Sequence, residues 1–335
     1  MPIVSVIIPT YNRAAYVGQA IESVCRQTLQ EWELMVVDDG STDQTREVVA
    51  HYLTDRRIRY LSQTHQERSA ARNLGIVSSS APYVALLDAD DFWMPDKLAK
   101  QVTAMAQHPK VGLCYTLIRQ VDEQGRTLDP IRDGRARAGR ILSYVLQDNC
   151  IGTSSVLIRR HCLGRSGLFD TSLPAYGRED WDLWIRLTRW YPVLPLEEEL
   201  TLHRVHAGNS SCEQNFRSGL AVLDKLCQDR ALLVEAGMSR AALSAYLRLS
   251  SAASPSPDIR RWTRTKRFAW AALHYPPCAL SRMALIAAAR LLLPRAVVKP
   301  LRSGYRRVVA HELRLGGKAA KPGEPIADAS FAQTP

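Results

Sequence analysis

The residues with the clearest capacity for chemistry are two acidic clusters, each placed directly after a short apolar run. The clusters are Asp38-Asp39-Gly40-Ser41 and Asp88-Ala89-Asp90-Asp91. Carboxylates, waters and phosphate oxygens are the ligands that Mg²⁺ and Mn²⁺ prefer. A divalent cation held by one or two protein carboxylates usually completes its coordination shell with a substrate diphosphate. A cation held by Asp88 and Asp90 would neutralise the charge that develops on the diphosphate as it leaves. The second cluster therefore predicts Mg²⁺ or Mn²⁺ bound with a nucleotide diphosphate, and the alternative is a solvated turn or a helix cap.

Polar residues near the same strand ends have the groups needed to hold the rest of a nucleotide. We expect Asp39 to accept a hydrogen bond from a nucleobase N–H, and Asp38 to accept one from a ribose hydroxyl. The turn Pro9-Thr10-Tyr11 offers hydrogen bonding and stacking to the base, and Arg72 offers a cation to phosphate or carboxylate. The sequence has neither Gly-x-Gly-x-x-Gly nor Gly-x-x-x-x-Gly-Lys-Ser/Thr, which argues against a dinucleotide dehydrogenase and a P-loop enzyme.

The pair Glu179-Asp180 opens a Trp-rich amphipathic segment and supplies a candidate general base. A carboxylate in a pocket among tryptophans can have its pKa raised towards proton transfer. Asp180 is the predicted base, with Glu179 and Asp182 as second choices and capping of the helix N-terminus as the structural alternative. His206 lies in a predicted loop and is expected to ligate the metal or contact the diphosphate.

These residues need a scaffold that brings several strand ends together, and the first hundred residues predict one. Short apolar runs alternate there with segments of helical periodicity. The expected strands are Ile3–Ile8, Trp32–Val37, Ile58–Leu61 and Tyr83–Leu87, and the expected helices are Ala14–Gln27, Gln44–Tyr52, Glu67–Val77 and Asp96–Gln107. The pattern predicts an α/β fold whose mostly parallel sheet is covered by helices and binds ligands beyond the carboxyl ends of its strands.

The remaining chain continues this pattern less regularly. The expected strands are Val111–Ile118, Ser154–Arg160 and Leu200–Val205; the expected helices are Ile141–Leu146, Glu179–Tyr191, Phe216–Arg248, Ile259–Leu273 and Leu280–Leu293; and a surface hairpin or lid is expected from Val121 to Ala138. We divide the chain into a catalytic domain (1–215), a helical basic region (216–315) and a tail (316–335) whose composition predicts disorder.

The net charge of +11 is concentrated near the C-terminus. Residues 258–318 carry 14 Lys or Arg against 2 Asp or Glu, which accounts for the whole excess. These basic residues are interleaved with Trp262, Phe268 and Trp270, a pattern typical of helices on anionic membrane surfaces. The alternative is a solvated helical subdomain that packs on the catalytic core. No nucleic-acid-binding motif accompanies the charge, so we expect no nucleic-acid partner.

Cysteine usage and hydropathy indicate the compartment. The seven cysteines are widely spaced and include no Cys-x-x-Cys pair, which favours reduced thiols over a zinc site or a disulfide framework. The N-terminus lacks the features of a secretory leader, and no uncharged apolar stretch reaches 18 residues. We therefore expect a cytoplasmic protein that attaches peripherally to the inner face of the cell membrane.

Seven motifs occur in an order typical of one enzyme family. They are Ser5–Arg13 (SVIIPTYNR), Val36–Asp43 (VVDDGSTD), Ala70–Gly75 (AARNLG), Leu86–Asp91 (LLDADD), Gly152–Arg160 (GTSSVLIRR), Arg178–Leu187 (REDWDLWIRL) and Arg204–Ser210 (RVHAGNS). With these motifs the chain resembles the family 2 glycosyltransferases, which have the Rossmann-like GT-A fold, over about residues 3–210. A departure occurs at Gln66-Glu67-Arg68, where many relatives have a small, Gly-containing segment.

The resemblance implies an inverting transfer of a sugar from a nucleotide-diphosphate donor, usually a UDP-sugar, to an acceptor hydroxyl with Mg²⁺ or Mn²⁺. The family pattern places a base contact at Asp39, the Asp-x-Asp motif at Asp88-Ala89-Asp90, the general base at Asp180 and a residue near the metal and diphosphate at His206. We expect a role in bacterial-type surface polysaccharide or glycolipid synthesis, with a saccharide or lipid-linked saccharide acceptor.

Two other functions are weaker alternatives. A sugar nucleotidyltransferase normally needs a Gly- and basic-rich loop after its first strand, and Pro9-Thr10-Tyr11-Asn12 is not one. A non-catalytic nucleotide-binding protein predicts the loss of a key acid, whereas Asp88, Asp90 and Asp180 are all present.

Overall fold

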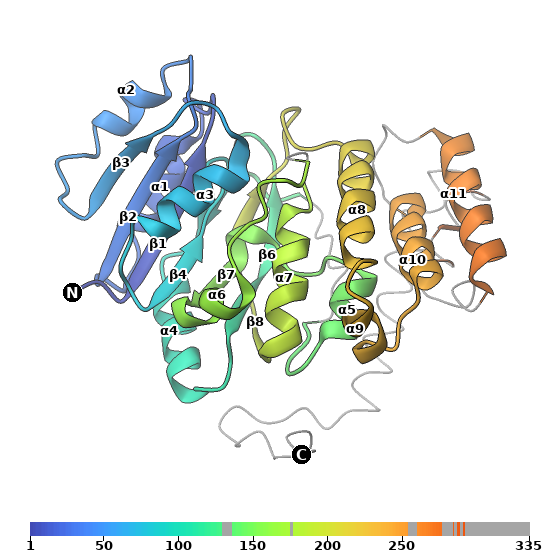
Figure 1. Cartoon of the computed structure of the whole chain (residues 1–335). Coiled ribbons are helices and arrows are strands. Elements are labelled where there is room, and N and C mark those ends of the chain that lie inside the picture. Colours follow the sequence, from blue (N-terminus) through green and yellow to red (C-terminus); the bar gives the residue numbers. More distant parts are fainter. Residues whose placement is uncertain are drawn as a thin grey trace.

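The computed structural model shows one mixed sheet with helices on both faces (Figure 1). The structure describes residues 1–128, 136–174, 177–253 and 260–276, together with 284, 287, 288 and 291. Within these residues the sheet has eight strands in the order β3-β2-β1-β4-β7-β6-β8-β5. The strands are β1 (Val4–Thr10), β2 (Trp32–Asp38), β3 (Ile58–Ser62), β4 (Tyr83–Leu86), β5 (Phe92–Trp93), β6 (Leu113–Val121), β7 (Val156–Arg159) and β8 (Val193–Arg204).

Helices separate most of the strands. They are α1 (Val17–Cys25), α2 (Thr45–Ala50), α3 (Glu67–Val77), α4 (Lys97–Gln107), α5 (Leu142–Gln147), α6 (Arg160–Ser166), α7 (Glu179–Trp190), α8 (Cys212–Leu226), α9 (Arg230–Glu235), α10 (Arg240–Ala253) and α11 (Arg261–His274), with a short 3₁₀ turn, η1 (Thr153–Ser155). The predicted α/β architecture with a mostly parallel sheet and C-terminal helices is confirmed.

Strand direction explains why the acidic clusters meet. Strands β3, β2, β1 and β4 are all parallel, so their carboxyl ends lie at one edge of the sheet. Thr10, the last residue of β1, pairs in register with Asp38, the last residue of β2. Beyond β4 the sheet is mixed, because β7 runs antiparallel to both β4 and β6. The two predicted acidic clusters follow β2 and β4, the parallel strands on either side of β1, and so lie at the edge where such sheets bind ligands.

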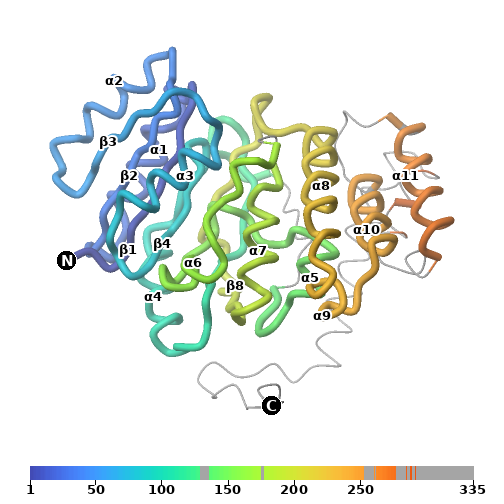
Figure 2. The backbone as a smooth tube through the Cα atoms, viewed as in Figure 1, coloured from blue at the N-terminus to red at the C-terminus, as the bar shows by residue number. Residues whose placement is uncertain are grey.

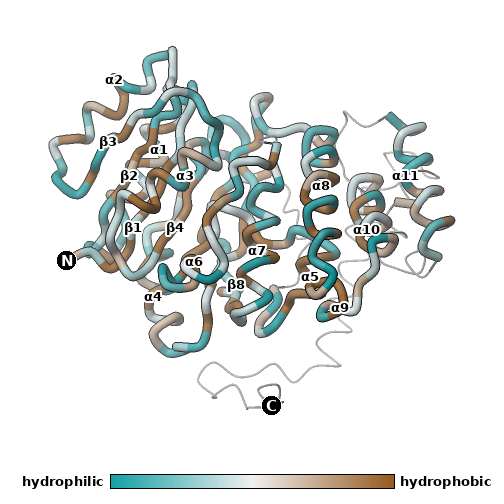
Figure 3. The backbone as a smooth tube through the Cα atoms, viewed as in Figure 1, coloured by the Kyte–Doolittle hydropathy of each residue, from teal (hydrophilic) through white to brown (hydrophobic). Residues whose placement is uncertain are grey.

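Two apolar layers, one on each face, hold the sheet between its helices. Side chains alternate across a strand, so Ile7 packs on the face covered by α3, α5 and α7, whereas Val6 and Ile8 pack on the face covered by α1 and α4. Figure 3 shows the hydrophobic residues gathered along the central strands. Because both faces of the parallel half are buried, its strands read as continuous apolar runs in the sequence.

Helix α3 approaches the sheet unusually closely. A Cβ atom added at Gly75 would lie 2.5 Å from Cγ2 of Ile7 and 3.1 Å from Cγ2 of Val37. The missing side chain lets the helix backbone rest directly on β1 and β2. This contact positions Arg72, one turn earlier in α3, at the sheet edge.

The C-terminal helices α8, α10 and α11 extend the molecule beyond α7 (Figures 1 and 2). Arg267 is buried: it donates hydrogen bonds to Ser251 and to Oε2 of Glu213, and its guanidinium lies 3.7 Å from the ring centroid of Phe216. Arg264 is also buried and donates to the carbonyl oxygen of Ala252. These two cations fasten α11 to its neighbours and are not available to a membrane surface.

Several predicted elements differ from the observed ones. The last strand, expected at Leu200–Val205, begins at Val193, and the expected helix Phe216–Arg248 is three helices, α8 to α10. Two short elements, β5 and α6, were not predicted. The expected helix Leu280–Leu293, the tail from 316, and part of the Val121–Ala138 segment lie outside the described residues. In the described part of the chain no helix is both long enough and apolar enough to cross a membrane, and the six cysteines there form no disulfide.

The close packing of α3 makes the stability effect of Gly75→Ala predictable. Alanine normally stabilises a helix by up to about 1 kcal/mol relative to glycine, but the added methyl group meets two buried side chains, and overpacking costs about 1–3 kcal/mol. We expect Gly75→Ala to lower the free energy of unfolding by about 1–2 kcal/mol in urea titrations. Gly164→Ala in α6 is the matched control, since nothing lies within 4 Å of its added Cβ. Equal stability of the two variants would contradict this account of α3.

Candidate functional site

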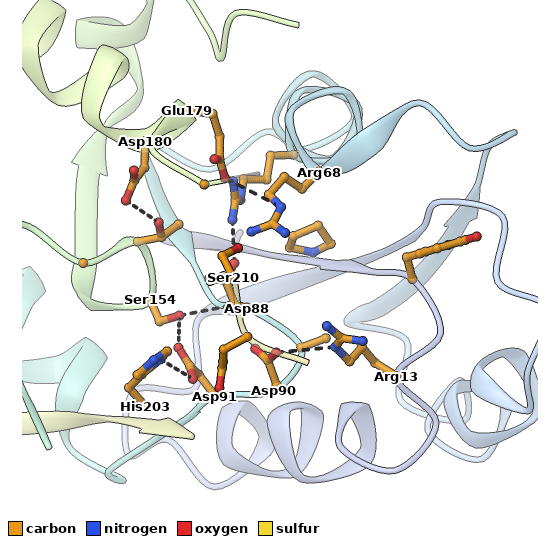
Figure 4. A pocket seen from close by; sticks show the side chains of 18 of the residues that line it. Arg13, Arg68, Asp88, Asp90, Asp91, Ser154, Glu179, Asp180, His203 and Ser210 are labelled. Carbon is orange, nitrogen blue, oxygen red and sulfur yellow. Dashed lines mark hydrogen bonds and ion pairs between the residues drawn. The ribbon is translucent and has the colours of Figure 1, made fainter. Parts of the chain in front are cut away.

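A cavity of about 590 Å³ opens at the carboxyl edge of the parallel strands. It brings together nine of the residues predicted from the sequence: Pro9, Thr10, Tyr11, Asp39, Arg72, Asp88, Ala89, Asp90 and Asp180. Figure 4 shows Glu179 and Asp180 on one side and the Asp88–Asp91 segment across from them. Asp38 and His206 do not line the cavity, although His206 contacts Asp90 at its edge.

One end of the cavity is an aromatic and acidic corner formed by the turns after β1, β2 and β3. The ring of Tyr11 stacks on His65 with centroids 4.1 Å apart, and Nδ1 of His65 lies 2.8 Å from Oδ2 of Asp39. Asp39 Oδ1 accepts hydrogen bonds from the amides of Gln63 and Gln66. Burial would lower the pKa of His65, but the charge of Asp39 outweighs it and raises that pKa.

Thr10 and Asp38 lie beside this corner and differ in their hydrogen bonding. Thr10 is buried, and the structure gives its Oγ1 atom no hydrogen-bond partner among the described residues. Asp38, by contrast, has both carboxylate oxygens engaged, one by the backbone N–H of Ser41 and the other by the hydroxyl of Tyr60. Its carboxylate fixes the turn after β2 and braces β3.

The Asp-x-Asp segment after β4 is held by cations on several elements. Asp90 Oδ2 lies 3.0 Å from Nε2 of His206 and 3.4 Å from Nε of Arg13. Burial would raise the pKa of Asp90, but the His206 hydrogen bond and the charge of Arg13 lower it to about 2. Asp91 contacts Nδ1 of His203 at 3.0 Å, and mainly for this reason the pKa of His203 rises to about 9.

A buried arginine connects the two sides of the cavity. Arg72 donates one hydrogen bond to Asp88 at 2.7 Å and another to Glu179 at 2.6 Å, and its side chain is only 2% exposed. Burial would raise the pKa of Glu179, but the charges of Arg72 and Arg68 lower it overall. Asp88 behaves differently: its pKa is raised, because burial and the neighbouring carboxylates Asp91 and Asp90 outweigh Arg72.

Asp180 has no cationic partner among the described residues. Its carboxylate accepts hydrogen bonds at 3.0 Å from the amide of Asn149 and from the hydroxyl of Thr153, and it also accepts one from the backbone N–H of Trp181. Burial, with Glu179 adding to the effect, raises the pKa of Asp180 to about 6. Such a carboxylate is mostly ionised at neutral pH and retains enough basicity to accept a proton.

The Asp88–Asp90 edge has the chemistry of a divalent-metal site. Two carboxylates and the imidazole of His206 gather there, and among the described residues Arg72 engages one oxygen of Asp88 and leaves the other open. Burial, together with the neighbouring carboxylates Asp91 and Asp90, raises the pKa of Asp88, and a bound divalent cation would favour its charged form. In the described part of the chain, no three acidic, His or Cys side chains already form a coordinating cluster. The donor set therefore fits an ion that takes much of its shell from a diphosphate.

Sequence reasoning missed His65 and the backbone of Glu67. Glu67, at the first position of α3, has φ of 72°, a left-handed conformation that favours glycine, and its carboxylate lies 3.4 Å from Nε2 of His65. The departure from the small, Gly-containing segment of many relatives was the available signal. The stacking of His65 on Tyr11 had no signal in the sequence, because the two residues come from turns more than fifty positions apart.

Comparison with protein-family models gives a match to glycosyl transferase family 2 over residues 5–170. An uncharacterised glycosyltransferase of Rickettsia bellii is 34% identical over 211 residues, which cover 62% of this chain and 29% of that protein. The chain spans about a third or less of the length of the first Rickettsia relatives it matches. TuaG of Bacillus subtilis, a glycosyltransferase named for teichuronic acid biosynthesis, is 35% identical over 169 residues, covering 49% of this chain and 65% of TuaG.

Solved structures share the fold over nearly the whole chain. Residues 1–349 of TarS from S. aureus, in complex with UDP-GlcNAc, align with a TM-score of 0.58 at 18% identity, covering 97% of this chain and 98% of that one. The mannosyltransferase PcManGT of Pyrobaculum calidifontis, in complex with GDP-Man and Mn²⁺, aligns with a TM-score of 0.59 at 21% identity, covering 95% and 88%. The fold is thus that of GT-A glycosyltransferase structures, as predicted.

The buried Arg72 pair has a testable effect on stability. Arg72→Met leaves the buried Glu179 with only Arg68, 3.9 Å away, and breaking a buried pair costs about 3–5 kcal/mol. The lowered pKa of Glu179 means that this stabilisation is present above the ordinary glutamate pKa and is lost as pH falls through the lowered value. We therefore expect a large loss of unfolding free energy at pH 7 that shrinks in acid. Arg119→Met, which removes a partly exposed pair with Glu199, should cost less than about 1 kcal/mol. If Arg72→Met lowered the free energy of unfolding only slightly and equally at all pH values, the Arg72–Glu179 pair would not be a major source of stability.

Proposed function

We propose that this chain transfers a sugar from a nucleotide-diphosphate donor to an acceptor hydroxyl with inversion, and the match of residues 5–170 to glycosyl transferase family 2 supports this proposal. The observation that carries the proposal is the cavity itself, with Asp88 and Asp90 on one wall and the partly basic carboxylate of Asp180 on the other. An in-line displacement needs the metal-site acids and the base on opposite walls, because the leaving diphosphate and the attacking hydroxyl lie on opposite faces of the sugar.

We assign the nucleoside to the corner formed by Pro9, Thr10, Tyr11 and Asp39. The unpartnered hydroxyl of Thr10 offers a hydrogen bond, Tyr11 offers a stacking face, and Asp39 accepts from a base N–H. Because His65 already contacts Asp39, a bound base must share that carboxylate with His65 or displace it. Asp38 is left out of this assignment, since its oxygens are committed to Ser41 and Tyr60.

The diphosphate is assigned to the Asp88-Ala89-Asp90 edge together with a divalent ion. Asp88 and Asp90 would hold Mg²⁺ or Mn²⁺, with His206 beside them, and the ion would neutralise the charge that develops on the leaving diphosphate. Arg72 contributes by keeping one oxygen of Asp88 in a fixed position. The structure of PcManGT in complex with GDP-Man and Mn²⁺ supports a divalent ion in general.

Asp180 is assigned as the general base. The acceptor hydroxyl attacks the anomeric carbon while Asp180 removes its proton, and Asn149 and Thr153 hold the carboxylate in place through neutral hydrogen bonds. Glu179, the second choice from the sequence, is a poorer base because Arg72 and Arg68 lower its pKa.

The donor and the biological role follow from the relatives by analogy. The UDP-GlcNAc complex of TarS favours a UDP-sugar, and the name of TuaG favours synthesis of a surface polysaccharide or glycolipid. Peripheral attachment of the basic C-terminal region to an anionic membrane stays a prediction. Liposome flotation with and without anionic lipid would test it.

Replacing the base should separate chemistry from binding. We expect Asp180→Asn to lower turnover at least about 100-fold, the usual contribution of a general base, while nucleotide-sugar affinity changes less than about twofold in isothermal titration. In the wild type, the rate should fall as pH drops through about 6, because Asp180 becomes protonated there. Asp224→Asn, at an exposed pair on α8, is the control. Loss of donor binding together with activity would contradict the assignment.

Replacing either metal-site acid should act on binding instead. We expect Asp88→Asn and Asp90→Asn each to weaken Mn²⁺-dependent binding of UDP by at least about tenfold, as the loss of a metal-supporting group typically does. Asp96→Asn, at an exposed position a few residues later, should leave the Mn²⁺ titration unchanged. If the Asp88→Asn and Asp90→Asn variants bound UDP with the same Mn²⁺ dependence as the wild type, these two residues would not be metal ligands.

A further inference from the structure

The wall of the cavity that carries Asp180 has a cation for which donor binding gives no role. Arg178 is the N-cap residue of α7, two positions before Asp180, and it lines the cavity together with Asn215 of α8. In an in-line displacement the base contacts the attacking hydroxyl, on the face of the sugar opposite the diphosphate. Arg178 therefore lies on the acceptor side of the site.

Arg178 is unpaired, unlike the other cations that line this cavity. Arg13 contacts Asp90, Arg68 and Arg72 contact Glu179, His65 contacts Asp39, and His203 contacts Asp91. The structure gives the Arg178 guanidinium no hydrogen bond or ion pair with any described residue, and its Nε atom is buried without a partner. Its one recorded interaction is with the ring of Trp181, 5.3 Å from the centroid.

The backbone holds this side chain in place at some cost. Arg178 has φ of 71°, a left-handed conformation that costs a non-glycine residue about 1–3 kcal/mol. The positive end of the α7 dipole also disfavours a cation at this position. An unpaired arginine with both penalties is not explained by the stability of the fold.

Two glycines make room for the arrangement. A Cβ atom added at Gly219 of α8 would lie 3.2 Å from Cδ of Arg178, so the missing side chain lets the arginine stem rest on α8. A Cβ atom added at Gly177 would lie 2.2 Å from Oδ1 of Asn215, so this glycine lets the amide approach the start of α7. No described residue pairs with the Asn215 side-chain amide, and it faces the same cavity as Arg178.

We propose that Arg178, assisted by the amide of Asn215, binds an anionic group on the acceptor, and that the acceptor substrate is therefore a hydroxyl compound bearing a phosphate or a carboxylate. A guanidinium presents paired N–H donors that match both anions, and an amide N–H adds a third donor. The contact orients the acceptor so that its hydroxyl faces Asp180. This inference rests on the proposed function and narrows its acceptor class.

The test uses the full chain saturated with Mg²⁺, which is diamagnetic, and UDP, or GDP if UDP does not bind, so that the diphosphate site is already filled. Two pairs of probes are titrated in ligand-observed NMR: glycerol 1-phosphate against glycerol, and glucuronate against glucose. At least one charged probe should bind about tenfold or more tightly than its neutral counterpart. The phosphate and carboxylate arms show which anion the site accepts.

Variants then assign the effect to Arg178. Arg178→Gln should weaken binding of the charged probe about tenfold, and Arg178→Lys should retain part of the affinity and serves if the glutamine variant does not fold. Arg217→Gln is the matched control, since Arg217 lies on α8, is 75% exposed and pairs only with Glu213 among the described residues. Nucleotide affinity should be unchanged in all three variants.

The outcomes separate this inference from the proposed function. Equal binding of charged and neutral probes, full binding by Arg178→Gln, or a loss of nucleotide affinity in Arg178→Gln would each overturn the acceptor assignment. A wild-type protein that binds no nucleoside diphosphate with Mg²⁺ or Mn²⁺ would instead overturn the proposed function.

Discussion

The site depends on one buried ion pair network, in which the guanidinium of Arg72 joins Asp88 to Glu179. Arg72 belongs to α3 on the parallel half of the sheet, and Glu179 opens α7 on the mixed half, 107 residues later. Because a buried charge without its partner is costly, the two halves cannot move apart without a large penalty. The close contact of Gly75 with β1 and β2 fixes where α3 lies and therefore where Arg72 reaches. The distance between the predicted metal edge and the predicted base is set in this way.

Charge pairing also explains why the adjacent carboxylates of Glu179 and Asp180 have such different pKa values. Glu179 faces Arg72 and Arg68, which lower its pKa, whereas Asp180 receives only neutral hydrogen bonds and its pKa rises to about 6. Their environments therefore make Glu179 a structural carboxylate and leave Asp180 able to accept a proton, as happens wherever paired carboxylates have distinct roles. Arg178 is the counterpart among the cations, because the other cations that line the cavity are paired and Arg178 has no hydrogen-bond or ion-pair partner in the described part of the chain. The two unmatched charges lie two residues apart on the same wall.

Sequence reasoning succeeded where strand geometry alone decides the outcome. The acidic clusters after β2 and β4 had to lie at the same edge of the sheet, because both strands run parallel to β1 between them. It could not separate Asp38 from Asp39, since only the structure shows that Ser41 and Tyr60 occupy the first carboxylate. Nor could the pattern of basic and aromatic residues in α11 show that Arg264 and Arg267 face neighbouring helices. Helical periodicity locates a face of a helix but does not identify what covers that face.

Backbone strain in the described residues is concentrated at the cavity. The non-glycine residues with positive φ there are Asn12, Glu67 and Arg178, and each lines the cavity or adjoins residues that do. Hydrogen bonds to the turn after β2 offset the strain at Asn12, because its Oδ1 accepts from the backbone N–H groups of Thr42 and Asp43. Glu67 has the contact with His65. Arg178 has no comparable partner among the described residues, so nothing in that part of the chain compensates for its conformation. A bound anion would supply the missing compensation, so the strained backbone at the start of α7 points to a ligand rather than to a requirement of the fold.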